Sequence, residues 1–248
     1  MTAASPSRET AASSSAVRLG ALSLALSGIL FLLYPALRPF SNEASFQGAL
    51  AFASPFWVLA HMLAAVGFIL LALSLLGLRI ALQKTAGERL ASVALVVTWI
   101  GVGLTLLYYG AETFALHALG QQAVTQHSTE LLTLVDAIRY GPAIFVFAVG
   151  LLLLAVGPIL AAIAIWRSGT LSRWSGIPFA LGFALYIPQF FGTQPIRVAH
   201  GLLVALGCLW VACPRDAQRD ESEEAIKKAV VHPSGQETRD ERRKCMYK

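Results

Sequence analysis

The stretch SPFWVLAHMLAAVGFILLALSLLGL, residues 54–78, decides the fold class of this chain. It opens with Ser54 and Pro55, a pair typical of a helix start, and continues as one apolar run. Its length matches the ~20 residues that cross a ~30 Å hydrocarbon core as a helix. Lipid offers the backbone no hydrogen-bond partner, so an apolar run in a bilayer must be helical. We therefore expect a transmembrane helix here.

Further apolar runs of similar length predict an all-α, polytopic transmembrane helical bundle of about six spans. Strands of a membrane barrel would be about ten residues long with alternating polarity, a pattern that these runs lack. The expected helices cover residues 17–37, 56–78, 90–109, 139–166, 174–191 and 195–211.

Composition divides the chain into three parts. Hydrophobic residues make up 56% of it and charged residues 13%, whereas a soluble domain carries about a quarter charged residues. Residues 1–16 and 214–248 lack the apolar material for a core, so we expect both to be mostly disordered, on either side of a transmembrane domain at 17–213. The net charge of +5 comes without a basic stripe interleaved with aromatics. The expected partner is therefore the lipid bilayer, and no nucleic acid.

The basic residues predict the orientation of the bundle. All of the 19 Lys and Arg residues except Arg38, Arg139 and Arg197 fall on the side that holds the N-terminus, two loops and the tail. Cytoplasmic loops carry an excess of Lys and Arg. We therefore expect both termini to be cytoplasmic, which agrees with an even number of spans.

Ionisable side chains gather toward the outer ends of the expected helices, where all histidines except His232 lie. A charged group in a membrane span costs about 2.5 kcal/mol or more at the centre, so it usually faces a partner or a wet cavity. We expect a polar cavity in the outer leaflet that binds a small ligand or cofactor. The residues expected to line it are Trp57, His61, Tyr109, Glu112, Asp136, Arg139, Tyr140, Arg197 and His200.

His61 and His200 are the deepest of these residues and the best candidates for a functional pair. Structural roles compete with this interpretation. The two histidines could hydrogen-bond between helices, and Asp136 with Arg139 could form an ion pair that fixes one helix. The aromatic residues Trp57, Tyr108 and Tyr109 could belong to an aromatic belt at the membrane boundary.

No HExxH, P-loop or GxSxG motif assigns a chemistry. A metal site would have to be assembled between helices from His61, His200 and Glu112, which would suit zinc or iron. A haem with His61 and His200 as axial ligands is also conceivable. The alternatives to a ligand-binding protein are a membrane-embedded metal-dependent enzyme, a carrier or channel, and a structural partner. A nearly apolar midplane counts against a carrier.

Three stretches resemble a family of bacterial multi-pass membrane proteins of unknown function: WIGVGLTLLYYGAETFALHALG (99–120), LVDAIRYGP (134–142) and RWSGIPFALGFALYIPQFFGTQPIRVAHG (173–201). The resemblance covers roughly residues 17–213. It implies a location in a bacterial plasma membrane and no particular activity. The residues that it picks out are Glu112, His117, Asp136, Arg139, Arg197 and His200.

Overall fold

The computed structural model describes residues 6–213, and every regular element among them is helical. The expected all-α bundle is therefore confirmed. Five helical segments are long and apolar enough to cross a membrane. They are residues 13–37 of α1 (Pro6–Leu37), α3 (Pro55–Ala81), α4 (Glu88–Gly110) with the helical turns that continue it to Gln126, α7 (Ala143–Ser168) and α9 (Gln194–Ala212).

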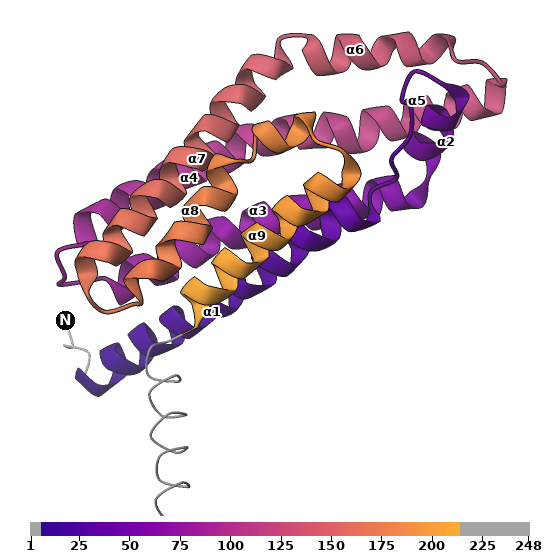
Figure 1. The fold of residues 1–248 in the computed structure, drawn as a ribbon. Helices are drawn as coiled ribbons and strands as arrows, with labels where there is room; N and C mark the ends of the chain where they lie inside the picture. The colour runs from indigo at the N-terminus through magenta and orange to yellow at the C-terminus, as the bar shows by residue number, and fades with distance from the viewer. Residues whose placement is uncertain (1–5, 214–248) are drawn as a thin grey trace, which may run out of the picture. The chain divides into compact units, whose positions relative to one another are not determined.

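The span expected at residues 174–191 is built from short pieces instead of one long helix. These are η3 (Arg173–Ser175), α8 (Gly176–Ala184) and η4 (Pro188–Phe191). Pro188 lacks an N–H and cannot continue the hydrogen-bonding pattern of α8. The pieces still connect the end of α7 with the start of α9, and α8 packs against both helices (Figure 1). This segment therefore adds a pass along the bundle to those of the long helices.

Helix α1 begins earlier than expected. Residues 6–16, expected to be disordered, continue the helix toward the N-terminus. This segment is rich in alanine and small polar residues, and an existing helix extends without the cost of a new nucleus. Residues 1–5 and the tail from 214 onward, also expected to be disordered, lie outside the described residues.

The long helices pack through small residues. Helix α1 lies against both α3 and α9, and α4 lies against α7 (Figure 1). A Cβ added at Gly20 would lie 2.6 Å from the Cα of Gly77, so α1 and α3 approach closely at this crossing. Ser27 of α1 donates a hydrogen bond to the Gly67 carbonyl of α3 at 2.7 Å. Both features are usual where helices associate in lipid.

A small second core lies at one end of the bundle, and the sequence analysis did not expect it. Helix α4 continues through a π-helical turn, η1 (Ala111–Ala115), into α5 (Leu116–Gln126). Phe52, Trp57 and Leu116 are fully buried in this core. We call the elements around it the cap: α2 (Phe46–Ala53), α5, η2 (Glu130–Leu132) and α6 (Thr133–Tyr140).

The span expected at residues 139–166 begins later than the sequence analysis placed it. Helix α6 ends at Tyr140, Gly141 is extended at φ −73° and ψ −163°, and Pro142 caps the start of α7. The residue before a proline disfavours the helical region, so the helix breaks at this pair. Arg139 therefore belongs to the cap and not to a membrane span.

The two basic loops of the bundle lie at the opposite end from the cap. The loop between α3 and α4 contacts the end of α7. A Cβ added at Gly87 would lie 2.3 Å from the Ala164 carbonyl oxygen. Arg167 and Arg173 lie at that end of α7 and in η3. The charge asymmetry seen in the sequence thus becomes an asymmetry between the two ends of one bundle.

Candidate functional site

A cavity of about 670 Å³ opens between the long helices and the cap. Its wall combines the loop after α1, the end of α4, η1, α6, the start of α7, η4 and the start of α9. The charged residues in this wall are Arg38, Glu43, Glu112, Arg139 and Arg197. The volume lies within the range of small-molecule sites.

Arg139 is the centre of an ion network in this wall. Its Nε and Nη2 donate to the two carboxylate oxygens of Glu112 at 3.0 and 2.5 Å, a bidentate pair. Its Nη1 donates to Glu43, which also accepts a hydrogen bond from Arg38 at 2.8 Å. The side chains of Arg139 and Glu112 are 14% and 13% exposed. Such charge-assisted, bidentate contacts are stronger than neutral hydrogen bonds and fix the relative position of the two side chains.

The network shifts the pKa values of Glu43 and Arg139 toward their charged forms. Burial would raise the pKa of Glu43, but hydrogen bonds and charge interactions with Arg139, and then with Arg38, hold that pKa below its usual value. Burial would lower the pKa of Arg139, but the two carboxylates outweigh it and raise that pKa above its usual value. Charged groups therefore line the cavity throughout the neutral range.

Local structure positions the two carboxylates. Glu112 lies in the π-turn η1, a feature that re-aims side chains and is frequent at functional sites. Glu43 lies in a turn in which Asn42 Oδ1 accepts a hydrogen bond from the Ala44 N–H at 3.2 Å and Ser45 Oγ donates to the Asn42 carbonyl at 2.7 Å. Both turns are short and irregular, so apolar periodicity does not reveal them.

Arg197 has no carboxylate partner among the residues of the range 6–213. Its Nε and Nη2 donate to the carbonyls of Gly192 and Phe190 at 3.0 and 2.5 Å. The guanidinium carbons of Arg38 and Arg197 lie 4.7 and 5.2 Å from the centroid of the Phe40 ring. With three arginines against two glutamates, the cavity wall carries an excess positive charge on this side.

Aromatic rings form much of the remaining wall. Tyr108 stacks on Phe147 at 4.0 Å between centroids, and Phe147 contacts Phe190 at 5.8 Å. Tyr109 is buried beside them, whereas Tyr140 is 70% exposed at the rim. The site therefore offers a charged side and an apolar side to the same molecule.

His61 and Trp57 lie behind this wall and do not line it. His61 is fully buried, with Nδ1 2.7 Å from the Trp57 carbonyl oxygen and its ring against Tyr34 and Tyr109. Trp57 Nε1 donates to the Glu112 carbonyl at 2.9 Å. Trp57 thus contacts η1 from behind the wall, and neither Trp57 nor His61 is among the residues that line this cavity.

His200 lies in a different place. Its Nε2 is 2.7 Å from the Gly182 carbonyl oxygen of α8, and its ring packs on Tyr186 with centroids 5.3 Å apart. It contributes to a hollow of about 10 Å³, room for about one water molecule, between α1, α9 and the segment that leads from α8 into η4. His61 and His200 therefore do not share a cavity.

The structure does not assemble the proposed metal set. Among residues 6–213, no three His, Cys, Asp or Glu side chains are arranged to hold a metal ion, so His61, His200 and Glu112 form no such site. The two histidine rings have different aromatic neighbours, Tyr34 beside His61 and Tyr186 beside His200. Asp136 is exposed, and Arg139 pairs with Glu112 and Glu43 instead of with it.

The residues that sequence reasoning placed in the cavity and that the structure brings together there are Tyr109, Glu112, Arg139, Tyr140 and Arg197. It missed Arg38, Glu43 and Phe40. Their position in the sequence could have indicated Arg38 and Glu43. These two residues flank the loop after the first apolar run, on the side of the bundle that has few basic residues.

Comparison with known proteins gives no match to a family model, to a curated protein or to a solved structure. The account of function therefore depends on the chain's own residues.

Proposed function

We propose that this chain is an integral membrane protein that binds a small organic anion with an apolar body in the cavity beside the cap. The carrying observation is the composition of the cavity wall, in which an ion network and an unpaired arginine face aromatic rings. An anionic group would meet Arg197 and Arg38, and the apolar body would meet Phe147 and Phe190.

The charges favour an anion over a cation. Both carboxylates in the wall already accept hydrogen bonds from Arg139, which neutralises part of their charge and weakens their attraction for an ammonium group. Arg38 makes one side-chain hydrogen bond within the described range, to Glu43, and its Nε is buried without a partner. A guanidinium group with donors left over suits a carboxylate or phosphate.

We further propose that the cavity opens on the outer face of a bacterial plasma membrane, with both termini inside. The support is the position of Lys84, Arg89, Arg167 and Arg173 at the far end of the bundle, as the positive-inside rule requires. A membrane-impermeant maleimide should label Ser41→Cys in intact cells of a strain whose native cysteines are replaced. Labelling that requires permeabilised cells would reverse the orientation.

Thermal unfolding of the purified full chain tests the proposed ligand class. The probes are phenylbutyrate, phenylbutylamine and phenylbutanol, which share a body and differ in charge. We expect phenylbutyrate to raise the melting temperature most, because a ligand that binds the folded state stabilises it. In Arg197→Gln, phenylbutyrate should fall to the level of phenylbutanol.

Two results would overturn the proposal. One is an equal shift with all three compounds, which would indicate partitioning into the detergent or lipid. The other is a full phenylbutyrate shift in Arg197→Gln, which would place the anion elsewhere. The control is Arg89→Gln, an exposed arginine in the first turn of α4, which should behave as wild type.

A further inference from the structure

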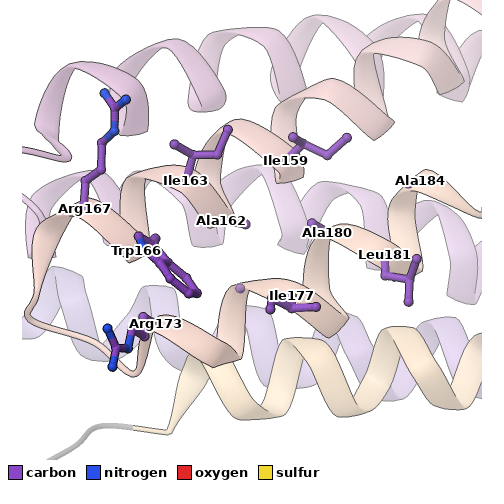
Figure 2. Close-up of a pocket in the computed structure, with 11 residues that line it drawn as sticks. Ile159, Ala162, Ile163, Trp166, Arg167, Arg173, Ile177, Ala180, Leu181 and Ala184 are labelled. Atoms are coloured by element: carbon purple, nitrogen blue, oxygen red, sulfur yellow. The ribbon is translucent and has the colours of Figure 1, made fainter.

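An apolar groove of about 550 Å³ runs between α7 and α8, away from the cavity beside the cap. Ile159 and Ile163 line it from α7, and Ile177 and Leu181 line it from α8 (Figure 2). These four side chains are between 39% and 48% exposed. In a membrane they would meet acyl chains.

The groove has a floor of small residues. A Cβ added at Gly176 would lie 2.9 Å from both Cα and Cβ of Ala162, so the backbones of α7 and α8 nearly touch there. Ala180 and Ala184 continue the floor along α8. The larger side chains on both rims leave a hollow between them, and its lining is almost entirely apolar.

One end of the groove carries positive charge. Figure 2 shows Arg167 and Arg173 at the same end, on either side of Trp166, with the apolar side chains along the rest. The Arg173 guanidinium carbon lies 5.5 Å from the Trp166 ring and 5.9 Å from the Trp174 ring. Neither arginine has an ion pair with a carboxylate within residues 6–213. Two exposed cations therefore lack a neutralising partner in the described structure.

The dimensions place the groove in one leaflet. From Ile159 to Arg167 the helix rises about 12 Å at ~1.5 Å per residue, less than half of a ~30 Å hydrocarbon core. Tryptophan and arginine at one end mark the level of the lipid headgroups. An acyl chain in the groove would thus bring its own phosphate to Arg167 and Arg173.

We propose that this groove is a binding site for an anionic phospholipid, with one acyl chain between α7 and α8 and the phosphate at Arg167 and Arg173. Charge complementarity selects the occupant: a zwitterionic lipid could supply the same chain but no net negative charge. Basic residues near a membrane surface attract anionic lipids in this way. The inference is independent of the ligand proposed for the cavity beside the cap.

Native mass spectrometry of the detergent-purified full chain tests the site. The protein is titrated with phosphatidylglycerol and with phosphatidylcholine of the same acyl chains. We expect tighter binding of phosphatidylglycerol, and we expect Arg167→Gln with Arg173→Gln to weaken it about tenfold while leaving phosphatidylcholine unchanged. The matched control is Lys84→Gln with Arg89→Gln, which removes the same charge at the same end of the bundle, outside the groove.

A second pair of variants tests the acyl-chain part. Ala180→Trp fills the groove and should reduce phosphatidylglycerol binding, whereas Leu206→Trp, on the exposed face of α9, should not. Equal binding of the two lipids by wild type, or equal loss in the groove and control arginine variants, would overturn the proposal. Unchanged binding in Ala180→Trp would do the same, because it would reduce the site to unspecific surface charge.

Discussion

Arg139 connects three parts of the chain that lie far apart in the sequence. Its guanidinium group bonds Glu112, 27 residues before it, and Glu43, 96 residues before it. It thereby joins the cap, the π-turn η1 and the loop after α1 in one network. A planar group with five donors in a fixed geometry can do this, and a lysine ammonium cannot.

Replacing Arg139 by Gln should destabilise the protein strongly. Two largely buried carboxylates would lose their main partner, and unpairing a buried ion pair costs roughly 3 kcal/mol. Arg139→Lys should recover only part of the loss, because one ammonium cannot serve both carboxylates. Unfolding in mixed detergent micelles measures the difference. A stability of Arg139→Gln equal to that of Arg89→Gln would show that the network contributes nothing.

Acidification should weaken the same network. The folded state holds the pKa of Glu43 below its usual value of 4.5, so the folded state binds this proton less readily than the unfolded state. The resulting stability is present above about pH 4.5 and is lost as the pH falls through the lowered pKa. The melting temperature of wild type should therefore drop in this acid range. Glu43→Gln should show a smaller drop, and an identical drop would exclude Glu43 as the cause.

The residues of the cavity were partly predictable. Glu112, Arg139 and Arg197 stood out because a charged group near hydrocarbon needs a partner. Their positions along the apolar runs also indicated that all three lie toward the same end of the bundle. Whether His61 and His200 would meet was not predictable, because a sequence does not state which helices are neighbours. Helix α1 packs against both α3 and α9, and its Tyr34 contacts the His61 ring.

At the scale of elements, glycines decide how closely α4 and α7 approach. A Cβ on Gly101 would lie 2.9 Å from the Gly150 carbonyl oxygen, whereas a Cβ on Gly103 would meet nothing within 4 Å. The two positions lie on one helix and differ mainly in what faces them. Substitutions at these two glycines therefore distinguish the effect of helix packing on stability from the effect of helix propensity.

Gly101→Ala should destabilise the bundle by roughly 1–3 kcal/mol, because the added methyl group forces two backbones apart. Gly103→Ala should stabilise it by roughly 0.5–1 kcal/mol, because alanine restricts the unfolded chain and favours the helix. Comparing the two variants in the same unfolding assay tests the close packing. If both variants gain stability, α4 and α7 do not approach as described.

Element boundaries were predictable where apolar runs end in polar loops. Helix α3 begins at Pro55 and α9 begins at Gln194, each within one residue of its expected start. The cap was missed because its helices are short and amphipathic and resemble a solvated loop in composition. The division of the fifth pass into η3, α8 and η4 was missed because apolarity identifies a membrane segment but not its local backbone geometry.

At the scale of the whole described bundle, two ends have different chemistry. The cap end carries a paired ion network and a cavity, and the far end carries unpaired arginines beside tryptophans. The proposed anion-binding cavity at one end and the proposed lipid site at the other would both depend on the attraction between arginine and a negatively charged group. The first depends on hydrogen-bond geometry, and the second on charge at the headgroup level.

The most direct measurement of the central claim is the location of a bound anion in the full chain. A phenylalkyl carboxylate that carries a diazirine is photolysed with the protein in lipid nanodiscs, and mass spectrometry maps the adducts. Adducts on Tyr108, Tyr140 and Phe190, suppressed by excess phenylbutyrate and absent in Arg197→Gln, are the expected result. Adducts confined to Ile163 and Ile177 in the groove between α7 and α8, or unaffected by Arg197→Gln, would contradict the account.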